Sequence, residues 1–238
     1  TPHRFGFTGT MPEELVDQWN IIGKIGPVLY ERNSYQLRKD SYVSDVKVQI
    51  LKLEHNSEPD YPVTLRTPAE RYKVELDFLI NSKFRNNLLK SLCNKFDKNG
   101  LILVDYIEHG NIIHKYLTSL DKKVYFIRGE VGVEDRERVK SIMEMDDNVI
   151  VVAISKIFST GINIKNLHYI VFAGGGKAKI KTLQSIGRGL RLHKDKDCLI
   201  IFDIADDLRY GRDHLQKRVL HYQRENIEYG IKTIKENG

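Results

Sequence analysis

The sequence predicts an α/β fold in which helices cover both faces of a parallel sheet. Short runs that are apolar along their whole length alternate with segments that have the apolar spacing of amphipathic helices. Such strands are typical of parallel sheets, because the helical crossovers between strands bury both sides of the sheet. The expected strands lie at residues 101–104, 124–127, 149–154, 168–172 and 198–202, and the expected helices at 110–120, 134–145 and 179–191.

Local signals define the segments on either side of this region. Thr67, Pro68 and Glu70 predict a helix start, because Thr can cap the helix, Pro fits its first position and Glu closes a capping box. An alternating pattern predicts a strand before this point. We therefore expect a strand at 46–53, helices at 68–80 and 83–96, and a polar helix at 213–235 that is interrupted at Gly230.

The first part of the chain has the pattern of a short strand and a helix. Residues 5–8 are suited to a strand, and Thr10 can cap a helix that Gly23 and Gly26 would end. The chain begins with Thr1 rather than Met and enters an apolar run almost at once. We therefore expect it to be a piece of a longer protein.

Composition narrows the class of protein. The chain has 238 residues, and 38 Lys plus Arg against 32 Asp plus Glu give a net charge of +6. This excess is compatible with a phosphate-rich partner, but it is too small to predict one alone. Two cysteines exclude a disulfide-stapled scaffold. No apolar run approaches the ~20 residues that cross a bilayer, and the N-terminus lacks the sequence pattern of a signal peptide. We therefore expect a cytoplasmic protein (host cytoplasm if phage-encoded) without membrane contact.

Two segments have residues suited to phosphate groups. Residues 155–164 follow an expected strand and offer hydroxyls, Lys156 and Gly161, although an ordinary polar turn has a similar composition. In the second segment Arg188 and Arg191 share one face of an expected helix with Gln184. Arginines can bind a polyphosphate through paired hydrogen bonds, whereas the alternative is a solvated basic helix face.

These segments resemble the motifs of superfamily-two helicases, in the family's order. The stretch Gln184-x-x-Gly187-Arg188-x-x-Arg191 is similar to motif VI, and residues 155–167 and 100–110 are similar to motifs V and IV. Thr8-Gly9-Thr10 resembles motif III. Parts of the chain look like the XPB-like and phage UvsW-like branch of the family, namely residues 25–30, 37–48, 158–162 and 165–168.

The resemblance implies a motor of two RecA-like domains, with ATP in the cleft between them and nucleic acid across both. In that family the arginines of motif VI reach the ATP phosphates, which implies an arginine-finger role for Arg191 and Arg188. The resemblance also places Gln184, Gly161 and Asn163 beside the nucleotide, although many relatives carry Asp where this chain has Asn163.

The other implied roles concern the nucleic acid and its coupling to ATP. The resemblance implies that Ser155, Thr160 and Lys156 contact the nucleic-acid backbone. It also implies that Thr8 and Thr10 couple the ATP state to binding of the nucleic-acid strand. The sequence contains no phosphate-binding Gly-x-x-x-x-Gly-Lys-Ser/Thr loop and no acidic box for Mg²⁺. The resemblance places both in a preceding motor domain, so we expect the chain alone not to hydrolyse ATP.

We therefore interpret residues 1–30 as the end of a first RecA-like motor domain, 31–80 as a connector and 81–238 as the second motor domain. The implied function is the C-terminal half of an ATP-dependent DNA helicase or translocase that acts in recombination and repair. Its partners would be DNA and the missing N-terminal motor domain, and its cofactors ATP and Mg²⁺. The alternatives are the motor part of a restriction enzyme and a non-catalytic nucleic-acid-binding module.

Other groups of polar residues favour ordinary structural roles. Asp203, Asp206 and Asp207 follow an expected strand and could in principle hold Mg²⁺, but we expect a solvated loop. The histidines show no metal-ligand spacing, so we expect no metal site in this chain.

Overall fold

The computed structural model describes residues 3–8, 11–12, 14–31, 34–40, 44–64, 67–128, 133–158, 164, 166–174 and 198–236. The chain divides into two compact units, residues 1–33 and residues 34–238. The boundary between the units lies near residue 33. The segment expected to be a connector, residues 31–80, therefore contributes a strand and helices to the second unit.

The first unit contains one helix, α1 (Leu15–Ile25), among its described residues. The helix ends at Gly26, whose φ of +121° is a conformation that favours glycine. The strand expected at residues 5–8 does not form, and α1 begins after Glu14 rather than at Thr10. No residue of α1 is buried. A helix of this length without buried apolar residues is marginal by itself, and none of the described residues of this unit belongs to a buried core.

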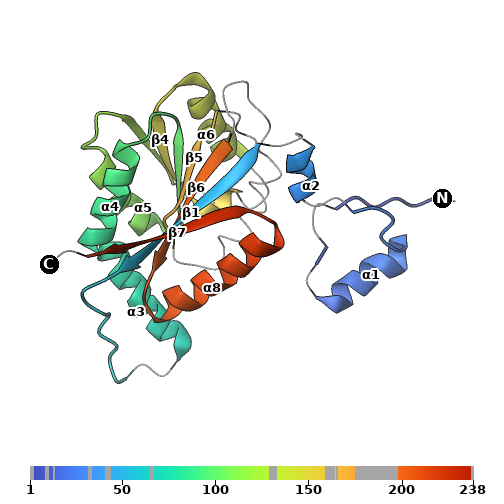
Figure 1. The fold of residues 1–238 in the computed structure, drawn as a ribbon, viewed down its shortest axis with the longest axis horizontal. Helices are drawn as coiled ribbons and strands as arrows, with labels where there is room; N and C mark the ends of the chain where they lie inside the picture. Colours follow the sequence, from blue (N-terminus) through green and yellow to red (C-terminus); the bar gives the residue numbers. More distant parts are fainter. Residues whose placement is uncertain are drawn as a thin grey trace. The chain divides into compact units, whose positions relative to one another are not determined.

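The second unit is built on a seven-stranded sheet with the order β3-β4-β2-β5-β6-β1-β7. Every neighbouring pair of strands is parallel, as the apolar runs predict. The strands are β1 (Asp45–Glu54), β2 (Gly100–Val104), β3 (Lys123–Ile127), β4 (Val149–Ile154), β5 (Tyr169–Phe172), β6 (Cys198–Asp206) and β7 (Glu228–Lys235) (Figure 1).

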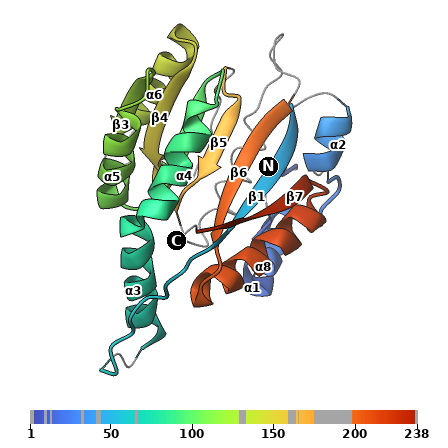
Figure 2. The same cartoon turned by 60° about the vertical axis from the view of Figure 1, so that its left-hand side comes forward.

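Helices cover both faces of this sheet (Figures 1 and 2). One apolar cluster joins the sheet to α4 and α5, and a second joins the opposite face to α6 and α8. Together the two clusters bury almost every apolar residue of the central strands. The helices of the unit are α2 (Ser34–Lys39), α3 (Pro68–Asn81), α4 (Lys83–Asn94), α5 (Ile107–Leu117), α6 (Val133–Met145) and α8 (Arg209–Arg224), and a 3₁₀ helix, η1, spans Ser155–Phe158.

The start of α3 confirms the capping signal in the sequence. The Thr67 side chain accepts a hydrogen bond from the Glu70 amide at 3.2 Å, and the Glu70 carboxylate accepts one from the Thr67 amide at 2.9 Å. Pro68 occupies the first helical position, where its missing N–H costs nothing. The capping box therefore fixes where α3 leaves the preceding loop.

The prediction for the C-terminus was wrong. Residues 213–235 do not form one helix: α8 ends at Arg224, and β7 then pairs in parallel with β1. Asn226 has a φ of +47°, a left-handed conformation that commonly terminates helices. Ile227, the residue before β7, is buried, and Tyr229 and Ile234 within the strand are half-buried. Most other residues of β7 are exposed, so the sequence does not clearly show where the helical spacing of apolar residues gives way to the alternation of a strand.

Candidate functional site

All seven strands end at the same edge of the sheet, because they are parallel. We call this the carboxyl edge; loops at this edge position ligands in open α/β sheets. Its described part falls into two regions. The loop half comprises residues 105–107, 155–156 and 173–174, which follow β2, β4 and β5. The network half comprises the side chains at the ends of β6, β1 and β7 and their partners, which are Arg85, His55, His109, Asp206 and Glu236.

The loop half contains two of the residues expected to contact nucleic acid, and the structure gives them different roles. The Ser155 hydroxyl is buried and donates a hydrogen bond to the Val104 carbonyl at 3.1 Å, which links the end of β4 to the end of β2. The neighbouring Lys156 is exposed. Ser155 thus positions the start of the loop, whereas the charge of Lys156 is in contact with solvent.

The loop after β2 adds exposed side chains that the sequence reasoning missed. Tyr106 and Ile107 are 46% and 51% exposed, although they lie only two and three residues after a fully buried strand. Large side chains immediately after an apolar run were the available signal. A Cβ atom on Gly174 would lie 2.4 Å from a carboxylate oxygen of Asp105, so the glycine allows the loops after β2 and β5 to pack closely.

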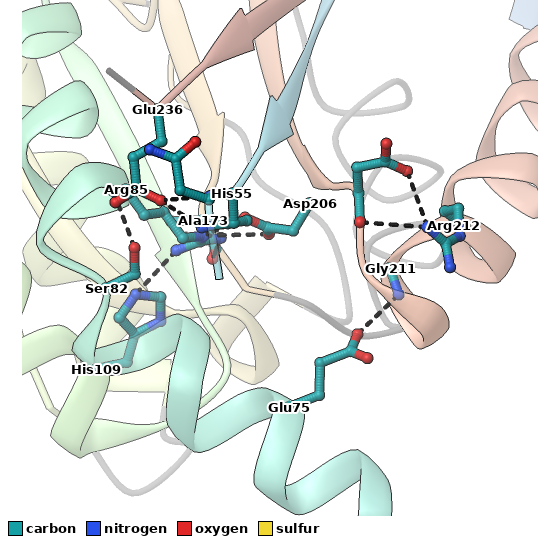
Figure 3. A network of polar contacts seen from close by, with 12 residues as sticks. His55, Glu75, Ser82, Arg85, His109, Ala173, Asp206, Gly211, Arg212 and Glu236 are labelled. Atoms are coloured by element: carbon teal, nitrogen blue, oxygen red, sulfur yellow. Dashed lines mark hydrogen bonds and ion pairs between the residues drawn. The ribbon is translucent and has the colours of Figure 1, made fainter. Parts of the chain in front are cut away.

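Arg85 is the centre of the network half (Figure 3). Its side chain lies in α4 and is almost completely buried. The guanidinium donates through Nε to both carboxylate oxygens of Asp206 at 3.2 Å, and another nitrogen donates to the Ala173 carbonyl. The third nitrogen lies 3.2 Å from His109 Nε2, which must accept because an arginine has only donors. One side chain therefore joins α4 to α5 and to the ends of β5 and β6.

His55 extends this network to the neighbouring strands. Its Nε2 lies 3.0 Å from Asp206 Oδ1 and donates to that carboxylate, while Nδ1 lies 4.0 Å from Glu236. The rings of Phe78 and Phe84 contact the imidazole edge-on. His55 and Asn56 follow β1, and the Asn56 amide donates to the Glu236 carboxylate at 2.9 Å just after β7, so polar contacts join the ends of three adjacent strands (Figure 3).

A second buried carboxylate fixes the start of α8. Glu75, which α3 places almost out of contact with solvent, accepts hydrogen bonds from the amides of Tyr210 and Gly211 at 3.0 and 2.9 Å. These amides belong to the first turn of α8, where the helix dipole favours a negative charge. The Tyr61 hydroxyl also donates to Glu75, and burial together with this carboxylate raises the pKa of Tyr61 to about 12.

The aspartates of β6 correct another expectation. Asp203 and Asp206 do not lie in a solvated loop: β6 continues to Asp206, and both side chains are buried. Asp203 accepts from Arg218 at 2.7 Å and from the Tyr222 hydroxyl at 2.8 Å, and burial followed by the charge of Asp203 raises the pKa of Tyr222. In the part of the chain that the structure describes, no three or more His, Cys, Asp or Glu side chains form a metal-binding group. The expectation of no metal site stays a prediction.

The remaining predicted site residues lie either in the first unit or outside the described part of the chain. Thr8 is exposed in the first unit. The residues that lie outside the described part of the chain are Thr10, Thr160, Gly161, Asn163, Gln184, Arg188 and Arg191. Among the described residues, no helix combines the length and the apolar character that a membrane crossing requires.

The chain is similar to proteins of the helicase superfamily. Residues 83–193 match the family described as "Helicase conserved C-terminal domain". The ATP-dependent DNA helicase uvsW of Enterobacteria phage T4 is 28% identical over 97% of this chain and 49% of its own length. The XPB helicase/translocase subunit of the transcription and DNA repair factor IIH of Dictyostelium discoideum is 28% identical over 82% of this chain and 24% of its length.

Solved structures agree with this relationship. The crystal structure of T4 UvsW matches 92% of this chain and 45% of that chain with a TM-score of 0.61 and 28% identity. A fragment of a putative HsdR subunit of a type I restriction enzyme from Vibrio vulnificus matches with a TM-score of 0.64 and 17% identity, which shows the fold alone. The sheet of residues 34–238 is that of a RecA-like helicase C-terminal domain. The chain spans about half the length of the phage helicase that it matches.

Proposed function

We propose that this chain, whose residues 83–193 match the helicase conserved C-terminal domain, is the C-terminal half of an ATP-dependent DNA helicase or translocase. The observation that carries the proposal is the match to the T4 helicase, which extends over 97% of the chain and therefore includes both units. The substrate would be single-stranded or branched DNA in recombination or repair. The restriction-enzyme alternative rests on likeness of fold only.

In this proposal the carboxyl edge contributes to the nucleic-acid track. Lys156 would contact a phosphate, and the exposed ring of Tyr106 would contact a sugar or a base, because stacking on aromatic rings tolerates any sequence. Ser155 would hold the loop in place through its bond to Val104. The exposure of these groups next to a rigid, fully buried strand supports this assignment.

ATP would bind between this domain and a preceding motor domain. We assign charge stabilisation at the γ-phosphate to Arg191 and Arg188, and nucleotide contacts to Gln184, Gly161 and Asn163. Bound Mg²⁺ would neutralise the phosphate oxygens, and its ligands would belong to the preceding domain. Thr8 and Thr10 would couple the ATP state to the grip on DNA.

The first unit would be the end of that preceding domain. The exposed apolar side chains of this unit support the assignment, because a group of large apolar side chains on a protein surface commonly marks a contact with another domain. They include Phe7, Trp19 and Leu29, which are 98%, 66% and 86% exposed. We propose that the rest of the first motor domain covers them.

The test is Arg191→Ala in the full-length protein, with Arg224→Ala as the matched control. Arg224 is exposed at the end of α8, so its replacement removes the same charge outside the proposed ATP cleft. Arg191→Ala should lower DNA-stimulated ATP hydrolysis on the order of 10³- to 10⁵-fold, the usual value of an arginine finger. Arg191→Lys should not restore the rate, because an ammonium lacks the planar paired contact.

The measurement is steady-state ATPase at saturating DNA, with DNA binding and thermal melting on the same preparations. If Arg191→Ala hydrolyses ATP at close to the parent rate, as Arg224→Ala should, the assignment is wrong. The 238-residue chain alone should show no DNA-stimulated turnover. It should also bind DNA weakly and with a strong dependence on salt, because half of the track would be missing.

A further inference from the structure

We propose that Arg85 is a positioning residue that couples the DNA-facing loop after β2 to the segment carrying the proposed ATP-binding arginines. This inference rests on the proposed function and adds to it a residue outside every motif that the sequence reasoning selected. The structural basis is one buried guanidinium whose three nitrogens contact three different elements.

The first of these contacts leads to the DNA side. Arg85 donates to His109, which lies in the first turn of α5, two residues after the exposed Ile107 and three after the exposed Tyr106. The amide of Gly110 closes the same turn by donating to the Tyr106 carbonyl at 3.1 Å. The position of the loop therefore depends on where His109 is held.

The second contact leads to the ATP side. Arg85 donates to the carbonyl of Ala173, the residue that follows β5. The chain continues from there into residues 175–197, which contain Gln184, Arg188 and Arg191. The amides of Ala173 and Gly174 both donate to the Leu103 carbonyl at the end of β2, at 2.9 and 3.1 Å. Arg85 thus fixes the point at which this segment leaves the sheet.

The third contact fixes the guanidinium itself. Asp206 accepts from Arg85 and also from His55, so the carboxylate is held by β6 and by the residue after β1. A guanidinium is planar and offers its donors in a fixed fork. A shift of α5 therefore changes the bond to Ala173 unless one of the contacts breaks. The rigid fork is what makes Arg85 suited to coupling rather than only to neutralising Asp206.

Arg218 is a suitable control, because it is also a buried arginine paired with an aspartate but, among the described residues, does not link α5 to the end of β5. Arg218 is as deeply buried as Arg85 and donates to Asp203 at 2.7 Å. Its bonds connect α8 to the middle of β6, and no described hydrogen bond joins it to α5 or to the end of β5. Replacing either arginine by lysine keeps the positive charge but removes the fork.

The experiment compares Arg85→Lys, Arg218→Lys and His109→Leu with the parent in the full-length protein. His109→Leu removes one of the three contacts of Arg85 and leaves its ion pair with Asp206. This variant therefore tests the coupling if Arg85→Lys does not fold. The quantities are the basal ATPase rate, the DNA-stimulated kcat and the DNA concentration for half-maximal stimulation. Amide hydrogen exchange at residues 110, 173 and 174 is followed on the same samples.

Arg85→Lys should lower the DNA-stimulated kcat by about 10- to 100-fold, the loss expected when reacting groups are misplaced by about 1 Å. The basal rate and the DNA concentration for half-maximal stimulation should stay within about 3-fold, because the binding groups themselves are retained. His109→Leu should lose part of the stimulation. Exchange at residues 110, 173 and 174 should rise in both variants and stay at the parent rate in Arg218→Lys.

The results distinguish a failure of the proposed helicase function from a failure of the coupling role of Arg85. If the parent shows no DNA-stimulated hydrolysis, the proposed function fails, and the exchange data alone decide whether Arg85 links the two segments. If the parent is stimulated and His109→Leu or folded Arg85→Lys is stimulated equally, the coupling proposal is overturned. It is also overturned if Arg218→Lys loses as much stimulation as Arg85→Lys, because the effect would then follow from any buried arginine.

Discussion

The two halves of the carboxyl edge differ in what their polar groups bind. In the network half, the carboxylate of Asp206 and the guanidinium of Arg85 are buried and bind one another and the protein backbone. In the loop half, Lys156 and Tyr106 are exposed. A buried charge costs several kcal/mol unless the protein supplies its partners. The charges of the network half therefore bind one another and stabilise the fold rather than a ligand. Side chains in the loop half are hydrated, and a ligand can replace the water molecules that they bind.

A sheet edge suited to ligands therefore need not bind them along its whole length. The ends of β6, β1 and β7 are tied together and support the neighbouring loops. Beyond the backbone pairing of β4 and β2, the hydrogen bond from Ser155 to Val104 links the ends of these strands, and large side chains after them are exposed. Substitutions in the network half should therefore change stability, and those in the loop half should change binding.

The largest effect on stability is expected for Asp206→Ala. Removing this carboxylate leaves Arg85 buried without its counter-charge and His55 without its acceptor, which should cost about 3–5 kcal/mol of unfolding free energy. The control is Asp213→Ala, an exposed aspartate of α8 that should change stability by less than about 0.5 kcal/mol. Urea unfolding followed by circular dichroism measures both. Equal midpoints for the two variants would contradict the distinction between the halves.

The next effect is steric. A Cβ atom on Gly211 would lie 2.2 Å from the backbone oxygen of Asp206, so Gly211→Ala must displace the start of α8 from the end of β6. Such overpacking should cost about 1–3 kcal/mol. Gly23→Ala is the control, because no atom lies within 4 Å of the added carbon. Thermal melting should show a lower midpoint only for Gly211→Ala.

A smaller loss is expected when the cap of α8 is weakened. In Glu75→Gln the side chain keeps one acceptor oxygen, but its NH₂ group replaces the second acceptor toward the amides of Tyr210 and Gly211. The helix dipole also loses its negative partner, so we expect a loss of about 1–2 kcal/mol. Chemical denaturation measures it. An unchanged midpoint would show that this carboxylate does not stabilise the helix start.

How far the sequence predicts these features depends on the range of the interactions. Apolar runs and the capping box at Thr67 are local, and they predicted the parallel sheet and the start of α3 correctly. The Arg85–Asp206 pair joins residues that are 121 positions apart, and no local pattern contains it. The available signal was that Arg85 shares the apolar stripe of α4 with Leu89 and Cys93, where an exposed arginine would not be expected.

The C-terminal strand β7 also depends on contacts between distant residues, which local sequence patterns do not predict. Residues 213–235 contain enough charged residues to suit a solvated helix, and only Asn226 and the alternation after it indicate a strand. What decides the conformation is the outer edge of β1, whose backbone groups β7 satisfies. That edge exists only once β1 has joined β6. The nucleotide-side residues Arg188 and Arg191 lie outside the described part of the chain, so their roles stay predictions.

The smallest effect on stability, and the one that tests the loop half, is expected for Lys156→Ala. An exposed lysine should change the unfolding free energy by less than about 0.5 kcal/mol. If Lys156 contacts a phosphate, its loss should reduce the slope of log K against log [salt] by about 0.7–0.9, the value of one released counterion. Lys217→Ala, an exposed lysine on α8, removes the same charge away from this edge and should leave the slope unchanged. The measurement is a DNA titration of the full-length protein at several salt concentrations. Equal slopes for the two variants would mean that the loop half attracts DNA only through net charge, and the contrast between the two halves would then concern stability alone.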